Sequence, residues 1–276
     1  MIKEKAFAKI NLSLNVLGKR EDGFHELETI MAPINLYDEL YFEENNSNEM
    51  ILLDDTIEDN SILKAAKLFQ ETYNTKGATI RLKKRIPLEA GLAGGSADSS
   101  ATLRGLNRLF NLNIPLKELE KLAIKLGSDN VFCLYNHSAI CRGRGELLEF
   151  IEENFKFNIT IIKPSFGLLT KDVFKEIKFT GKKECSDILK AIKSNDCKLL
   201  DKSIYNDLHD SAIKIHPELI SFEKYLEKYG YQVHMSGSGP TLFVFNLKQT
   251  AQKQLKKAFD DLILVKCKIK KRYHNW

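Results

Sequence analysis

The 276-residue sequence lacks several features that would assign it to a special class of protein. Its five cysteines include no C-x-x-C pair and are odd in number, which predicts reduced thiols rather than a disulfide framework or a zinc site. No stretch approaches about 18 consecutive apolar residues. The first residues also lack a cationic segment followed by an apolar run and a small-residue cleavage site. These absences predict a cytoplasmic protein with no membrane partner.

A strong excess of one charge is also missing. The net charge is only +5, and the basic residues are scattered, so a nucleic-acid partner is not implied although anionic substrates would fit. Lysines over 265–272 alternate with apolar residues, which favours the solvent face of a strand over a nucleic-acid tail. The composition, 43% hydrophobic and 29% charged, is typical of a globular protein with a sizeable core, and the length fits one large domain or two lobes.

Periodicity predicts a chain of mixed α-helices and β-strands. Apolar residues alternate from Ala6 to Val16, which predicts a strand with one buried face and one polar face, and Lys9 and Asn11 lie on the polar face. Pro115 and Gly127 bracket a helical pattern between them. Further strands are predicted over 27–53, 78–85, 138–141, 147–150, 158–164 and 231–245, and another at the end of the chain. Further helices are predicted over 61–73, 171–229 and 248–260.

The segment Pro87–Ser100, PLEAGLAGGSADSS, reads as a glycine-rich loop between a strand and a helix. It has neither the lysine of a Walker loop nor the G-x-G-x-x-G spacing of a dinucleotide fingerprint. Free N–H groups and the positive end of the helix dipole would face this loop, which predicts a site for anionic oxygens. A purely structural turn explains the three glycines equally well.

Other candidate residues are ambiguous when each is considered alone. The turn MSGSGPT, residues 235–241, could be a tight hairpin or a second loop that closes on a ligand. Lys9 could be an ordinary surface lysine, and Asp129 a helix cap or turn residue. Phe24 and His25 could be a packed aromatic residue and a surface histidine.

Four motifs in order narrow these alternatives. AKINLSL, DGFHEL, PLEAGLAGGSADSSATL with LGSD downstream, and MSGSGP resemble the superfamily of galactokinase, homoserine kinase, mevalonate kinase and phosphomevalonate kinase, the GHMP kinases. Within it the motifs are most similar to the 4-diphosphocytidyl-2-C-methyl-D-erythritol kinase family, over Ile2 to about Lys270. The resemblance implies an α+β, two-lobed GHMP kinase fold. The N-terminal lobe, 1–157, would be ribosomal protein S5 domain 2-like with a left-handed β-α-β crossover, and the C-terminal lobe, 158–276, would be ferredoxin-like.

The resemblance also implies an activity and a site. The activity is ATP-dependent phosphorylation of the 2-hydroxyl of a cytidine diphosphate-linked methylerythritol, in the non-mevalonate route to isoprenoid precursors, with Mg²⁺. Lys9 and Asp129 would be the catalytic pair. The residues that would hold the ATP phosphates are Pro87, Leu88, Glu89, Ala90, Gly91, Leu92, Ala93, Gly94, Gly95, Ser96 and Ala97. The residues that would bind the acceptor are Asn11, Phe24, His25, Phe174, Gly237 and Gly239. Protein ligands to the metal are not assigned, and a monomer or homodimer is expected.

Three positions depart from the family pattern. Phe24 replaces a usual tyrosine, Asn130-Val131 follow Asp129 where an apolar residue and proline are common, and Asn136-His137 stand where two glycines are common.

Two other functions therefore remain open. One is a related GHMP kinase or weakly active paralogue with a different alcohol acceptor, such as homoserine or mevalonate. The other is a non-catalytic RNA-binding module with the same crossover, against which the dispersed charge speaks.

Overall fold

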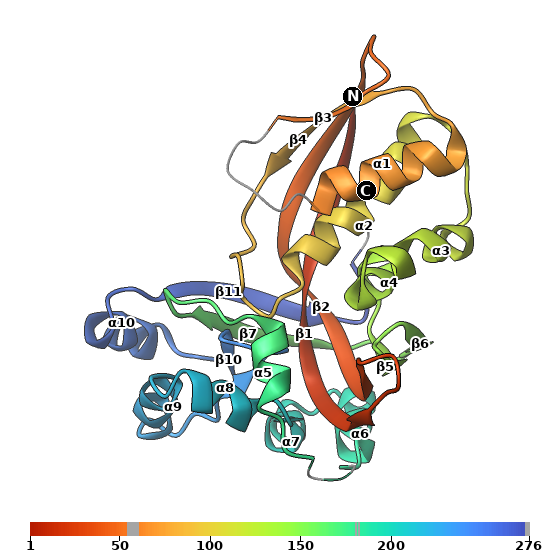
Figure 1. Cartoon of the computed structure of the whole chain (residues 1–276). Helices are drawn as coiled ribbons and strands as arrows, with labels where there is room; N and C mark the ends of the chain where they lie inside the picture. Colours follow the sequence, from red (N-terminus) through yellow and green to blue (C-terminus); the bar gives the residue numbers. More distant parts are fainter. Residues whose placement is uncertain (54–60, 180, 182, 274–276) are drawn as a thin grey trace.

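Two long paired strands organise the molecule, which we describe from a computed structural model of residues 1–53, 61–179, 181 and 183–273 (Figure 1). Strand β1 (Ile2–Lys19) pairs antiparallel with β2 (His25–Glu44) along nearly its whole length. The pair runs through the full height of Figure 1, so residues of both halves of the molecule lie against it. Register shifts occur between Phe7 and Lys9 and between Asn11 and Ser13. Such irregularities re-aim the side chains next to them.

The predicted polar face of β1 is not exposed. Lys9, Asn11, Ser13 and Asn15 are all buried, as are the apolar residues that alternate with them. Buried polar groups need partners. Asn15 donates to the hydroxyl of Tyr205, and the hydroxyl of Ser13 accepts from the backbone N–H of Ile30. Alternation predicted the strand correctly, but it could not show that both faces are covered.

The remaining strands join β1 and β2 in one mixed sheet. They are β3 (Met50–Leu53), β4 (Ala78–Lys83), β5 (Ala139–Gly143), β6 (Leu147–Phe150), β7 (Lys156–Lys163), β8 (Tyr205–Asn206), β9 (His234–Met235), β10 (Leu242–Phe245) and β11 (Ile263–Lys270). The main path is ordered β3-β4-β2-β11-β7-β10-β9; β1 pairs with β2 and β8, and β5 with β2 and β6. The sheet therefore continues from one half of the chain into the other.

The helices fall into two groups (Figure 1). The first group, beside the upper part of the β1–β2 pair, is α1 (Ser61–Tyr73), α2 (Gly94–Leu109), α3 (Leu116–Leu126) and α4 (Ser128–Tyr135). The second group is α5 (Thr170–Lys175), α6 (Ser186–Ser194), α7 (Cys197–Ser203), α8 (His209–Ile215), α9 (Leu219–Glu227) and α10 (Gln249–Ala258). None of the helices within the described ranges is both long and apolar enough to cross a membrane.

Two apolar cores stabilise these groups. The larger core joins the first group of helices, together with α6 and α7, to the sheet, and the smaller one lies under α5, α8, α9 and α10. Strand β7 contributes Ile159 and Ile161 to the larger core and Ile162 to the smaller one, because alternate residues of a strand point to opposite faces. The predicted division after residue 157 falls inside this strand, and it stays a prediction.

Candidate active site

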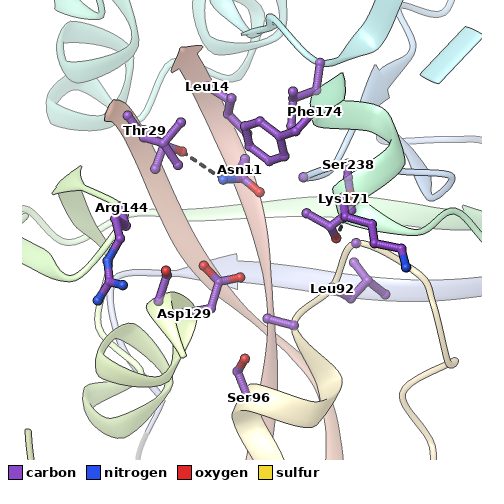
Figure 2. Close-up of a pocket in the computed structure, with 18 of the residues that line it drawn as sticks. Asn11, Leu14, Thr29, Leu92, Ser96, Asp129, Arg144, Lys171, Phe174 and Ser238 are labelled. Atoms are coloured by element: carbon purple, nitrogen blue, oxygen red, sulfur yellow. Dashed lines mark hydrogen bonds between the residues drawn. The ribbon is translucent and has the colours of Figure 1, made fainter. Parts of the chain in front are cut away.

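A groove of about 1070 Å³ opens beside β1 and β2. Its walls come from the glycine-rich segment, from the first turns of α2 and α4, from the turn after β5, from α5 and from the 235–241 turn. Figure 2 shows side chains from these separate elements pointing into a common space. Such a concave site with a few convergent polar groups is the usual place for a small ligand.

Lys9 lies in the floor of the groove and is only 4% exposed. Its Nζ donates to Asn11 Oδ1 at 2.8 Å and to the carbonyl oxygen of Gly91 at 3.3 Å. Asn11 in turn donates to Thr29 Oγ1 at 2.8 Å, the bond drawn in Figure 2. These bonds hold the ammonium in one place, so the interpretation of Lys9 as a surface lysine is wrong.

Asp129 faces Lys9 across the floor. Its Oδ2 lies 3.5 Å from Lys9 Nζ, and the side chain keeps 34% of its surface exposed to the groove. Asp129 belongs to the first turn of α4, a helix that was not predicted from the sequence. The positive end of the helix stabilises a carboxylate there. A buried ammonium and an accessible carboxylate can together accept a proton from a hydroxyl group and stabilise the resulting negative charge.

The glycine-rich segment forms a tight cradle above this pair. Gly91 has φ +68°, and a Cβ there would clash with the carbonyl oxygen of Ser236, so no larger residue fits. Ala93, at φ 57°, is also left-handed and precedes α2, which begins at Gly94, inside the glycine-rich segment. Within the described residues no side chain caps this end of α2. Its first N–H groups and helix dipole therefore favour anionic oxygens.

The second glycine turn packs directly on the first. Ser236 Oγ donates to the carbonyl oxygen of Gly91 at 3.1 Å, and a Cβ on Gly237 would lie 2.9 Å from that same oxygen and 3.2 Å from Lys9 Nζ. Asn206 of β8 donates to the carbonyl oxygens of Met235 and Gly237 at 3.0 and 2.8 Å. The two turns, far apart in the sequence, therefore fix each other and close the floor around Lys9.

Aromatic residues stand at the other end of the groove. The rings of His25 and Phe174 stack with centroids 4.8 Å apart and an angle of 26°. Phe24 is half exposed, and the guanidinium of Arg144 lies 4.8 Å from its ring centroid. Burial, and the charge of Lys19 in addition, lower the pKa of His25, so its ring is neutral near pH 7. Flat rings and a neutral imidazole suit a planar base.

Two buried contacts support the cradle from below. Asn130, which departs from the family pattern, donates to the carbonyl oxygen of Ser96 at 3.3 Å and so ties α4 to the start of α2. Lys84 Nζ contacts Asp38 at 2.5 Å and Asp98 at 2.7 Å. Burial raises the pKa of Asp98 to about 8. The nearby charge of Asp38 adds to this shift, and the Lys84 ammonium opposes it.

Most of the predicted residues line this one groove. They are Lys9, Asn11, Phe24, His25, the segment from Pro87 to Ser96, Asp129, Phe174 and Gly237. Two others do not line it. Ala97 is buried inside α2, and Gly239 packs against Met235 behind the second turn.

Several residues that line the groove were not predicted from the sequence. Thr29 holds Asn11, Arg144 covers Phe24, and Lys171 extends from α5 toward the cradle (Figure 2). Thr29 pairs in register with Leu14 of the apolar set, so alternation alone would place it on the apolar face, and the register shift between Asn11 and Ser13 brings it to Asn11. Arg144 lies in the predicted turn after residue 141, and nothing in its spacing indicates that the turn folds back over Phe24.

Comparisons with known proteins agree with this geometry. The family described as GHMP kinases N terminal domain matches residues 60–137, and GHMP kinases C terminal matches residues 188–262. The 4-diphosphocytidyl-2-C-methyl-D-erythritol kinase of Clostridium tetani is 41% identical over 259 residues, covering 88% of this chain and 90% of that protein. The chain belongs to this family of GHMP kinases.

Solved structures extend the likeness to the whole GHMP kinase fold. A crystal structure of 4-(cytidine 5'-diphospho)-2C-methyl-D-erythritol kinase superposes with a TM-score of 0.83 at 29% identity, covering 98% of this chain and 99% of that one. Homoserine kinase from Cytophaga hutchinsonii shares the fold at 20% identity, with a TM-score of 0.73, covering 98% of this chain and 95% of that one. The predicted α+β GHMP kinase fold is confirmed, and so is the enzyme class, an ATP-dependent small-molecule kinase.

Proposed function

We propose that this protein transfers the γ-phosphoryl group of ATP to the 2-hydroxyl of 4-diphosphocytidyl-2-C-methyl-D-erythritol, a step of the non-mevalonate route to isoprenoid precursors. The observation that carries the proposal is the position of the Lys9–Asp129 pair, between a cradle for anionic oxygens and a group of aromatic rings. The name of the Clostridium tetani relative supports this choice of acceptor over homoserine or mevalonate.

Asp129 and Lys9 have complementary tasks in this proposal. Asp129 accepts or orients the proton of the acceptor hydroxyl, and its exposed oxygens allow that contact. Lys9, held by Asn11 and Gly91, stabilises the negative charge that develops on the acceptor oxygen. A tertiary alcohol is a poor nucleophile, so correct positioning supplies much of the rate.

The cradle fits the triphosphate of ATP. The tight left-handed turn at Gly91 leaves no side chain in the way, and the uncapped start of α2 directs N–H groups at the ligand. Among the described residues no group of three or more His, Cys, Asp or Glu could hold a metal alone. Mg²⁺ commonly takes only one or two protein ligands and completes its shell with phosphate and water, which neutralises charge during transfer. We propose the Ser96 hydroxyl, which faces the groove, as one such ligand.

The aromatic end of the groove would recognise the cytidine. Phe24 and Phe174 supply rings for stacking, and the neutral imidazole of His25 supplies one donor and one acceptor for the edge of the base. The expected oligomeric state, a monomer or a homodimer, stays a prediction.

A panel of acceptors tests the proposed function. The purified protein is incubated with ATP, Mg²⁺ and, separately, the diphosphocytidyl acceptor, homoserine and mevalonate. ADP release is measured, and the new phosphate is located by phosphorus NMR. We expect turnover only with the diphosphocytidyl acceptor, with phosphate on its 2-hydroxyl. A folded protein that turns over another acceptor, or none of the three, would refute the proposal.

A further inference from the structure

A second cavity, of about 610 Å³, lies at the far end of the helix that carries Asp129. Helix α4 begins beside the groove at Ser128 and ends at Tyr135, which lines the second cavity. The ends of β6 and β11 complete its walls. No described residue lines both cavities, so this one is separate from the groove.

His137 lines this cavity, and its ring carries a buried polar atom that is not used. Its ring stacks on Phe150 with centroids 4.8 Å apart and an angle of 11°, and the residue is only 7% exposed. Within the described residues, its Nε2 has no hydrogen-bond partner. Burial lowers the pKa of His137, and although the charge of Glu152 opposes this shift, Arg272 and Lys271 add to it, so the ring is neutral near pH 7. A buried polar atom without a partner in the protein is rare, and pairing it with a polar atom of a ligand or water lowers the free energy.

Cations surround this imidazole. Lys271 is engaged, since its Nζ lies 2.7 Å from a carboxylate oxygen of Glu152. Lys270 and Arg272 form no ion pair with any carboxylate in the described part of the chain, and both line the cavity. Lys270 instead lies 5.6 Å from the ring centroid of Tyr273. The cavity therefore has more positive than negative charge, with two cations available to an anion.

Aromatic side chains form the apolar part of the wall. Phe150 keeps 36% of its surface exposed, and Tyr135 packs against its edge with centroids 5.0 Å apart. The hydroxyl of Tyr135 donates to Glu120, so the tyrosine ring is fixed. An exposed ring next to a buried imidazole and two available cations is a combination suited to a flat ligand with a negative group.

We propose that this cavity binds a small ring compound that carries a phosphate group. The phosphate contacts Lys270 and Arg272, the ring lies against Phe150, and His137 Nε2 forms a hydrogen bond with a polar atom of the ligand. This site is additional to the ATP and acceptor sites and does not depend on the function proposed for the groove.

Calorimetry with phenyl phosphate tests the proposal. The full-length protein is first saturated with ADP and Mg²⁺, so that the groove is occupied, and phenyl phosphate is then titrated in. We expect one site with a dissociation constant of about 1 mM or tighter. Arg272→Gln is expected to weaken binding about tenfold, because it removes one charge-assisted hydrogen bond. His137→Phe, which keeps a flat ring, is expected to weaken it several-fold.

Two control variants test whether phenyl phosphate binds at this cavity and nowhere else. Lys256→Gln removes an exposed cation on α10, and Arg144→Gln removes a cation of the groove; both should bind phenyl phosphate as the unchanged protein does. Inorganic phosphate and phenol should each bind at least about tenfold more weakly. The proposal is overturned by an absence of binding heat, by an affinity that Arg272→Gln leaves unchanged, by a loss caused by Arg144→Gln, or by equal affinity for inorganic phosphate. Melting temperatures confirm that each variant is folded.

Discussion

The floor and the rim of the groove are built differently. In the floor, Lys9 and Asn11 are buried, and the two glycine turns hold each other through the Ser236 hydroxyl and close backbone packing. At the rim, Phe24 is half exposed and Arg144 covers it, while Lys171 reaches in from a helix of six residues. The floor is fixed before any ligand arrives, whereas the rim contains side chains that can move. We infer that the floor determines the chemistry and the rim the choice of acceptor.

The largest effect is expected from Asp129→Asn. The amide keeps the shape of the side chain but cannot take the proton from the acceptor hydroxyl, so kcat should fall by about 10³-fold or more. The dissociation constants of ATP and of the acceptor should change less than about threefold, because the floor that binds them is unaltered. Steady-state kinetics and calorimetric titrations measure both. A kcat within tenfold of the unchanged enzyme would mean that Asp129 has no such role.

A smaller effect, on stability, is expected from Gly91→Ala. The new Cβ would clash with the Ser236 carbonyl oxygen, and alanine is disfavoured at φ +68°. We expect a loss of about 2–4 kcal/mol in the free energy of unfolding, measured by denaturant titration. Gly18→Ala is the matched control, since nothing lies within 4 Å of its Cβ position. Equal stability of the two variants would show that the turns do not fix each other.

Phe174→Ala is expected to act on the rim alone. Loss of one stacking ring should raise the KM of the acceptor about tenfold and leave the KM of ATP unchanged. Initial rates with each substrate varied in turn provide the measurement. Tyr229→Ala removes an exposed aromatic residue outside the groove and serves as the control. An increase in the KM of ATP instead would remove the distinction between floor and rim.

The effect that depends on pH concerns the support beneath the cradle. The pKa of Asp98 is about 8 in the folded protein and near 3.8 when the residue is exposed, so folding favours the protonated form. The unchanged protein should therefore lose stability as the pH rises from about 4 to about 8, because the unfolded chain ionises more easily.

Asp98→Asn cannot ionise and should escape this loss. We expect the stability of the variant relative to the unchanged protein to increase by roughly 3–4 kcal/mol between pH 5 and pH 8, because each pH unit between the two pKa values is worth about 1.4 kcal/mol. Thermal unfolding at the two pH values measures the change. A constant difference would indicate that Asp98 is ionised throughout this range and that Lys84 compensates both carboxylates.

The parts predictable from the sequence are those that depend on local pattern. Helix α1 over Ser61–Tyr73 and helix α3 between Pro115 and Gly127 follow from periodicity and end signals, and both were predicted to within about one residue. Strand alternation found β1, and the four short motifs, taken in order, found the family. These signals lie within a few neighbouring residues, so a single sequence contains them.

What could not be predicted depends on contacts between distant segments. Helix α4 has eight residues and no strong end signals, so the spacing around Asp129 predicted only a helix cap or a turn residue. The burial of Lys9 results from Gly91 and Gly237, which lie 82 and 228 positions later in the chain. Arg144 lies over Phe24 only because the turn after β5 folds back across the groove. Spacing along the chain does not encode such contacts.

The central claim is that Lys9 and Asp129 act as one catalytic unit in the floor. A double-mutant cycle on kcat, with Lys9→Met, Asp129→Asn and the combined variant, tests it most directly. We predict that the combined variant is at most about threefold slower than Asp129→Asn alone, because the partner of Lys9 is already lost. If instead the two losses multiply, Lys9 and Asp129 act independently and the account is contradicted.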